Sequence, residues 1–271
     1  MKKFLTLLCS VLAVASIFIG CGKSDDKKSE KKPLVVAMEL TYPPFETKDS
    51  TGNPTGISVD FANAFGEYIG REVKIENTEW NGLIPSLQTK KADMVISSMT
   101  ITEERKNTVD FSDPYANAFL AILANKNSNI LSIDDLDKPG KKVAVKTGST
   151  GFIFAKNNFK NAEIIALQDE SACVSEVSQG KADGFLYDQL TIYRNWQKNQ
   201  DTTSAVFIPF QDVESWGIAV EKGNTGLLSK LNEFISKYRE EGGFERITEK
   251  YLSEEKSAFD KLKFKWFFDL N

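Results

Sequence analysis

The sequence predicts an α/β protein with two similar lobes. The chain has 271 residues, of which 41% are hydrophobic, so it can form two domains of about 100–150 residues. Short apolar runs alternate with helical patterns from Pro33 onward. The segments SLQTKKADMVISS (86–98) and EVSQGKADGFLYD (176–188) also share a helix end, a lysine, Ala-Asp and a following strand, although Ala-Asp before a strand can recur by chance.

The N-terminal segment predicts export. MKK followed by FLTLLCSVLAVASIFIG has the charged start and short apolar core of a signal peptide, expected over residues 1–20. It ends in FIGC, which resembles a bacterial lipoprotein processing site with Cys21 as the lipidated residue, although Phe18 replaces the usual leucine. A plain signal peptide with an incidental cysteine is the alternative. Residues 21–32 are charged and polar, so they are expected to be a flexible tether that holds a soluble domain near a membrane.

Composition excludes several kinds of function. There are 34 basic and 38 acidic residues and no long basic block, so no nucleic-acid partner is expected. The chain has no histidine, which excludes Ser-His-Asp triads, Cys-His pairs and most zinc sites, and neither a metal nor a cofactor is expected. Cys173 is left without a disulfide partner in the mature chain and is expected to be a small packed residue.

The first elements alternate between strand and helix. A helix is expected over residues 58–70, ending at Gly70, and a short helix over 82–91. Strands are expected over 33–39, 72–78 and 92–98.

The segment SSMTITEERKNTVDFSDPY (97–115) contains an arginine in an unusual place. Thr100 and Glu103 fit a capping box at a helix start, and acidic residues suit that end of the helix dipole. Arg105 opposes the dipole by about 0.3–1 kcal/mol unless an anion offsets it. The sequence therefore raises the question of which anion Arg105 faces.

A second anion-binding feature is VAVKTGSTG (143–151). It reads as a strand, a glycine-rich turn and a helix start, where free N–H groups and the hydroxyls of Ser149 and Thr150 can bind an anion. The turn lacks the Gly-Lys-Ser/Thr of a nucleotide-binding loop, so a carboxylate fits it better than a triphosphate. An ordinary capped turn is the alternative.

Acidic and aromatic residues follow several strands at the edge where α/β sheets bind ligands. Asp188 follows the strand 183–187 and is either a helix N-cap or the partner of an ammonium group. Tyr42 and Trp80 follow two other strands, and Glu39 ends the first. Each aromatic alone could be an ordinary core or rim residue, but together they suit a solute with an aliphatic or cationic side chain.

Several of these motifs together resemble the polar amino-acid-binding branch of the bacterial extracellular solute-binding proteins, which serve ABC importers. The resemblance covers about residues 33–253. The motifs that carry it, in chain order, are AMELTYPPFE (37–46), GISVDFANAF (56–65), WNGLIPSLQTKKADMVISSMTITEERKNTVDFSDPY (80–115), VAVKTGSTG (143–151) and KADGFLYD (181–188).

The resemblance implies a type II, two-lobed clamp, each lobe a mainly parallel sheet flanked by helices. The chain would cross between the lobes twice, near residues 119–126 and 214–223. Lobe one would comprise 33–120 and 217–252, and lobe two 121–216. Residues 253–271 would be an aromatic-rich extension, either packed on lobe one or contacting a partner.

The resemblance also implies the ligand contacts. Arg105 would hold the α-carboxylate with Thr100, Ser149 and Thr150, and Asp188 would hold the α-ammonium near Ser98. Tyr42 and Trp80 would enclose the side chain. The residues that would face a distal cationic group are Glu39 and Ser97.

The expected function is binding of a free L-amino acid for an ABC permease, outside the cytoplasm, by a monomer anchored to the membrane at Cys21. Arginine, lysine or ornithine is the first choice of ligand, and glutamine or another uncharged polar amino acid is the alternative, because Lys146 matches a lysine of the glutamine binders. A dehydratase with Glu39 and Asp188 as acid and base is less favoured. A receptor or kinase sensor module would need a transmembrane helix and a signalling domain, which the sequence lacks.

Overall fold

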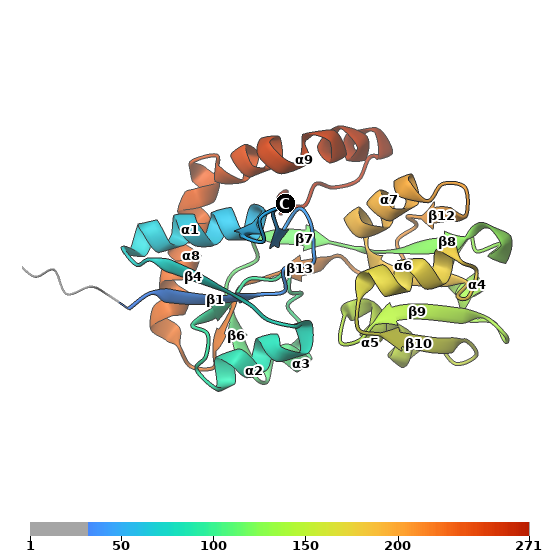
Figure 1. The fold of residues 1–271 in the computed structure, drawn as a ribbon, viewed down its shortest axis with the longest axis horizontal. Coiled ribbons are helices and arrows are strands. Elements are labelled where there is room, and N and C mark those ends of the chain that lie inside the picture. The colour runs from blue at the N-terminus through green and yellow to red at the C-terminus, as the bar shows by residue number, and fades with distance from the viewer. Residues whose placement is uncertain (1–31, 271) are drawn as a thin grey trace, which may run out of the picture. The chain divides into compact units, whose positions relative to one another are not determined.

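Two five-stranded sheets form the framework of residues 32–270, which are the residues that the computed structural model describes (Figure 1). The expected signal peptide, Cys21 and the tether up to residue 31 lie outside the described residues. In the described part of the chain, none of the helices combines the length and apolar character needed to cross a membrane.

The first sheet has the strand order β4-β1-β5-β14-β6. β1 pairs in parallel with β4 and β5, and β14 runs antiparallel to both β5 and β6, so four strands share one direction. β1 is almost wholly apolar because helices cover both faces of the sheet. The strands are β1 (Leu34–Met38), β4 (Val73–Asn77), β5 (Met94–Val95), β6 (Val109–Phe111) and β14 (Ala219–Glu221).

Helices cover both faces of this sheet. α1 and α8 pack on one face, and α2 packs on the other. α1 ends at Gly70 as predicted, because this glycine takes the left-handed conformation with φ 63° and its N–H donates to the carbonyl of Glu67. The elements are α1 (Ile57–Ile69), η1 (Trp80–Gly82), α2 (Leu83–Gln88), α3 (Glu103–Lys106), α8 (Thr225–Glu240) and the short strands β2 (Thr47–Lys48) and β3 (Pro54–Thr55).

The second sheet has the order β10-β9-β11-β8-β12 and repeats the plan of the first. β8 is the strand that runs against its neighbours. The strands are β8 (Leu120–Asn125), β9 (Lys142–Lys146), β10 (Glu163–Leu167), β11 (Gly184–Asp188) and β12 (Thr203–Val206). Its flanking elements are η2 (Lys126–Ser128), α4 (Ile133–Leu136), α5 (Thr150–Asn158), α6 (Glu170–Ser178) and α7 (Gln189–Lys198).

Cys173 lies on α6 and is fully buried among apolar residues of the second sheet. Burial raises the pKa of its thiol to about 12, so the thiolate that reacts as a nucleophile is disfavoured. The expected packing role is confirmed.

Two crossing strands connect the sheets. β7 (Ala116–Ala118) leads from β6 to β8, and β13 (Glu214–Trp216) leads back from β12 to β14 (Figure 1). The two strands pair antiparallel. Most of residues 119–126 form β8 inside the second sheet, so the first crossing begins a few residues before that segment.

The C-terminal segment completes the core of the first lobe. α9 (Gly243–Leu262) bends at Leu252, whose φ of −138° and ψ of 19° are not helical. After α9 the chain buries Trp266, Phe267 and Phe268 in the same apolar cluster as β1 and α1. The structure therefore places the aromatic extension in the core, one of the two arrangements that the sequence leaves open.

Candidate functional site

A pocket lies between the lobes, where strands of both sheets end. Glu39 directly follows β1, Lys146 ends β9 and Asp188 ends β11. All the ligand-binding residues expected from the sequence line this pocket except Lys146, which reaches it by pairing with Glu39. The structure thus brings together side chains from segments far apart in the chain.

At one end of the pocket is the guanidinium of Arg105. It is buried and donates from Nη1 to the carbonyl of Thr100 at 2.6 Å and from Nη2 to that of Gly148 at 3.0 Å. Its Cζ lies 5.3 Å from the ring centroid of Trp80. Burial lowers the pKa of Arg105, and the negative charge of Glu214 raises it. Arg105 therefore links both lobes through neutral acceptors.

The cap of α3 differs from the expected one. Thr102, not Thr100, is the N-cap, and its hydroxyl accepts from the N–H of Arg105 at 3.2 Å. The capping box of Thr100 and Glu103 is wrong because Thr100 forms an isolated β-bridge with Trp216, two residues before the cap. This leaves the Thr100 hydroxyl free of the helix, and it donates to Glu214 at 2.9 Å.

The glycine-rich turn brings α5 to the same end of the pocket. Ser149 caps α5 by accepting from the N–H of Phe152 at 3.2 Å, and the Thr150 hydroxyl donates to Glu214 at 2.8 Å. Gly148 has φ 75°, and a Cβ there would lie 3.1 Å from Trp80 Nε1. Glycine is thus needed both for the backbone and for the approach of the turn to Trp80.

Asp188 lies at another wall of the pocket and caps α7. Its Oδ1 accepts from the N–H groups of Leu190 at 3.0 Å and Thr191 at 3.1 Å, and burial raises its pKa. The hydroxyl of Tyr42 is buried beside Asp188 without a hydrogen bond of standard geometry to any described residue. Burial and the charge of Asp188 raise the pKa of Tyr42, so it stays a neutral donor. An aspartate and a buried hydroxyl thus lie together.

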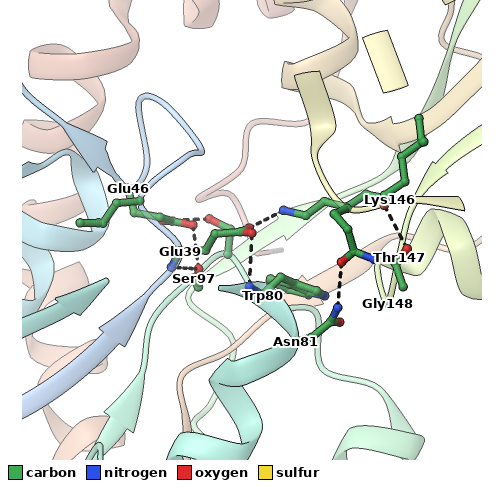
Figure 2. A network of polar contacts seen from close by, with 12 residues as sticks. Glu39, Glu46, Trp80, Asn81, Ser97, Lys146, Thr147 and Gly148 are labelled. Carbon is green, nitrogen blue, oxygen red and sulfur yellow. Dashed lines mark hydrogen bonds and ion pairs between the residues drawn. The ribbon is translucent and has the colours of Figure 1, made fainter. Parts of the chain in front are cut away.

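The remaining wall is an acidic cluster, shown in Figure 2. Lys146 reaches from the second lobe to an ion pair with Oε2 of Glu39, and both side chains are buried. Oε1 of Glu39 accepts from the N–H of Trp80 at 3.3 Å, and the Glu39 N–H donates to Ser97 Oγ at 3.0 Å. Ser97 Oγ in turn lies 3.5 Å from Oε1 of Glu46. Ser97 thus links the backbone of Glu39 to the carboxyl group of Glu46.

Glu46 is a pocket residue that the sequence reasoning missed. Its Oε2 accepts from Ser58 at 2.6 Å and Ser98 at 3.3 Å. Burial nevertheless raises the pKa of Glu46 to about 8, so it is mostly protonated at neutral pH. Glu46 ends the quoted segment AMELTYPPFE, but nothing local shows that its side chain turns inward.

Other lining residues were also missed. Tyr187 directly precedes Asp188, which was a usable signal, whereas no local pattern distinguishes Glu214. Glu170 does not line the pocket, but its pKa is raised to about 8. Burial has the larger effect, and the negative charge of Asp188 adds to it. The missed lining residues are Glu46, Leu120, Tyr187, Glu214 and Trp216.

The pocket is narrow and rich in carboxylates. Its free volume is about 40 Å³, enough for a few waters, since a cavity needs about 10–15 Å³ to hold one. A larger solute can enter only if side chains or lobes move apart. The described lining carries four carboxyl groups, on Glu39, Glu46, Asp188 and Glu214, and the cations there are Arg105 and the adjoining Lys146. No group of three or more metal-ligating side chains is found within residues 32–270.

Comparison with known proteins gives a consistent result. Residues 34–254 match the model of the bacterial extracellular solute-binding proteins, family 3. The chain is 34% identical to a probable histidine-binding protein of Neisseria gonorrhoeae over 94% of this chain and 97% of that protein. It is 32% identical to the L-cystine-binding protein TcyJ of Escherichia coli K12 over 84% and 85% of the two chains.

A solved structure has the same fold. An ancestral arginine-binding protein bound to arginine superposes with a TM-score of 0.76 and 36% identity, over 82% of this chain and 99% of that one. The expected type II, two-lobed fold is confirmed. The chain therefore belongs to family 3 of the bacterial extracellular solute-binding proteins.

Proposed function

We propose that this protein is the substrate-binding component of an ABC amino-acid importer and clamps one free amino acid between its lobes. The observation that carries this proposal is the pairing of opposite charges within one buried pocket. A buried arginine lies with two threonine hydroxyls in one part, and a buried aspartate with the buried hydroxyl of Tyr42 in another. This arrangement suits a ligand that carries both a carboxylate and an ammonium group.

Each group of the ligand then has its own partners. The α-carboxylate is bound by Arg105, together with Thr100, Ser149 and Thr150. Asp188 binds the α-ammonium near Ser98, through Oδ2, because both backbone N–H bonds engage Oδ1. The rings of Tyr42 and Trp80 enclose the aliphatic part of the side chain.

Within this function we propose a basic amino acid, namely arginine, lysine or ornithine. The acidic cluster of the pocket holds two carboxyl groups, on Glu39 and Glu46, and one cation, Lys146, so a cationic side chain there has a carboxyl partner. Such a side chain would lie near Glu39 and Ser97. Lys146 opposes this arrangement because it already pairs with Glu39. The ligand must therefore share Glu39 with Lys146 or draw on Glu46.

Binding is favoured over catalysis. The two carboxylates that could act as acid and base are both engaged, Glu39 by Lys146 and Asp188 by the N–H groups that begin α7. One of the matched structures is described as an ancestral amino acid-binding protein that is a precursor of cyclohexadienyl dehydratase. We therefore expect the amino acid to be recovered unchanged after incubation with the protein.

A thermal-shift screen over the twenty amino acids, ornithine and cystine tests the function, because a ligand that binds only the folded state raises the melting temperature. The hits are then titrated by calorimetry against Arg105→Ala and Asp188→Ala. Each substitution should abolish binding of all hits, since truncating one partner of a desolvated charge pair costs about 2–5 kcal/mol. Arg246→Ala, on α9 outside the pocket, is the control and should bind as the wild type does.

Glu39→Gln tests the class of ligand. It should weaken arginine, lysine and ornithine and spare or improve glutamine, because only a cationic side chain gains from the carboxylate. If Glu39→Gln binds arginine as tightly as the wild type, the basic ligand is excluded and an uncharged polar amino acid takes its place.

A further inference from the structure

Glu214 begins the crossing strand β13 and joins the two lobes through one carboxylate. Its Oε2 accepts from the hydroxyl of Thr100 at 2.9 Å and from that of Thr150 at 2.8 Å. Its Oε1 accepts from the side-chain amide of Gln211 at 2.6 Å. Thr100 lies beside α3 of the first lobe, and Thr150 begins α5 of the second. One oxygen atom therefore holds hydroxyls from both sides of the pocket.

The donors that Glu214 uses are those assigned above to the ligand. The positive charge of Arg105 lowers the pKa of Glu214, as do the bonds from Thr150 and Thr100, although burial raises it by more. A carboxylate thus already lies in the surroundings that suit the α-carboxylate of an amino acid. Arg105 already donates hydrogen bonds to two backbone carbonyls, those of Thr100 and Gly148.

A threonine hydroxyl has a single hydrogen to donate. Thr100 and Thr150 cannot therefore donate to Glu214 and to a ligand carboxylate at the same time. A ligand that binds both hydroxyls must first displace Glu214.

The displaced side chain has somewhere to go. Glu214, Thr100 and Thr150 line both the pocket and a wider groove of about 920 Å³ on their other side. That groove is also lined by Lys106 and Lys222. Both lysines already pair, with Glu103 and Asp110, and three aspartates also line the groove. Rotation into it would expose the Glu214 carboxylate to water, so displacement does not leave a buried, unpaired charge.

We propose that Glu214 is an internal competitor of the ligand, which occupies the carboxylate subsite, bridges the lobes and thereby sets the affinity of the pocket. The inference rests on the proposed function in one respect, that the ligand carboxylate binds beside Arg105. The bridge between lobes does not depend on which amino acid is bound.

The test compares the mature wild-type chain with Glu214→Ala and Glu214→Gln. L-arginine and L-glutamine are titrated by calorimetry, and small-angle scattering is recorded without amino acid. Loss of the competitor should tighten binding of the preferred probe by about tenfold or more in Glu214→Ala, since a larger fraction of the protein is ready to bind. The affinity of Glu214→Gln should lie between those of the wild type and Glu214→Ala, because its amide oxygen still accepts a hydrogen bond from one hydroxyl. The radius of gyration without amino acid should increase in Glu214→Ala.

The control is Asp212→Ala, which removes an exposed carboxylate two residues away and should change neither readout. If Glu214→Ala binds the probes more weakly than the wild type, Glu214 is a ligand-binding group and the proposal is overturned. Unchanged affinity with unchanged scattering overturns it as well. If no variant binds any amino acid but Glu214→Ala expands, the proposed function fails and the bridge stands.

Discussion

The guanidinium of Arg105 is held by two backbone carbonyls that belong to different lobes. Neutral acceptors fix its position without cancelling its charge. A positive charge that is buried and only partly compensated attracts an anion strongly, because little water is present to screen it. Glu214 supplies part of that compensation, and its hydrogen bonds to Thr100 and Thr150 keep the negative charge close by.

Glu46 should make the stability of the protein depend on pH. Its pKa is about 8 in the folded state and near the ordinary glutamate value of 4.5 in the unfolded chain, so the folded protein holds an extra proton between these values. The free energy of unfolding should therefore fall as pH rises from about 5 to about 8. Glu46→Gln should reduce this slope, as measured by calorimetric melting at several pH values.

Glu170 provides the comparison for that experiment. Its pKa is also about 8, so Glu170→Gln should remove a separate part of the slope, and the double variant should have the flattest profile. Equal slopes in the wild type and Glu46→Gln would mean that Glu46 is ionised in the folded protein at neutral pH.

Pocket residues that belong to a recognisable local motif could be predicted from the sequence, and those outside such a motif could not. Asp188 was expected as either an N-cap or a ligand partner, and the structure shows the cap inside the pocket. Glu214 is more than a hundred positions from Arg105, and only the return of the crossing strand brings their charges together. No local pattern encodes such an approach.

The C-terminal segment is the element that connects most parts of the fold. Phe267 packs edge-on against Phe45 and at a tilt against Trp216, with ring centroids 5.5 and 5.6 Å away. Its carbonyl accepts from the N–H of Asn117 on β7. α9 also reaches the second lobe, since Glu255 pairs with Arg194 of α7 at 2.8 Å (Figure 1). The segment therefore packs against both crossing strands, β7 and β13, as well as against the apolar core of the first lobe.

Phe267→Ala should destabilise the protein by about 3–5 kcal/mol, because a fully buried aromatic ring is replaced by a cavity. Chemical denaturation should show a lower midpoint with a similar slope. Leu262→Ala, in the same segment but 43% exposed, is the control and should stay within about 0.5 kcal/mol of the wild type. An equal loss in both variants would contradict a core role specific to the aromatic run.

Element types were predictable where periodicity was strong. The helix ending at Gly70 and the strands on either side of it appear as expected, because apolar spacing and a left-handed cap determine them locally. The N-cap of α3 lies two residues after the predicted one. Both threonines of TIT (100–102) are possible caps, and the bridge of Thr100 to Trp216 decides between them. Burial of the last aromatics depends on distant strands and could not be deduced.

For the molecule as a whole, the segment before residue 32 leads to a prediction about attachment. Metabolically labelled palmitate should enter the wild-type protein and be absent from Cys21→Ser, because the sequence FIGC resembles a lipoprotein processing site. Cys173→Ser is the control, since Cys173 is buried in the second lobe and should not affect labelling. Label that persists in Cys21→Ser would exclude a lipid anchor at this residue.

Several polar links cross between the lobes in this structure. They include Lys146 to Glu39, Arg105 to Gly148, Asn81 to Gln168, the bridge of Glu214 between Thr100 and Thr150, and the contacts of Arg194 with Glu255 and with the carbonyl of Pro43. With about 40 Å³ of free space between them, an amino acid must enter through a more open arrangement and then be enclosed. A ligand held by both lobes favours the closed state, because it makes contacts there that the open state cannot offer.

Addition of the best ligand from the screen should therefore reduce the radius of gyration measured by small-angle scattering. The reduction should be larger in Glu214→Ala, where the internal bridge no longer holds the lobes together beforehand. Asp188→Ala should show no reduction, since it lacks one of the charges that draw the ligand in. Saturating ligand could instead leave the scattering profiles of both the wild type and Glu214→Ala unchanged. Binding would then proceed without any change in the distance between the lobes, which would contradict a hinged clamp.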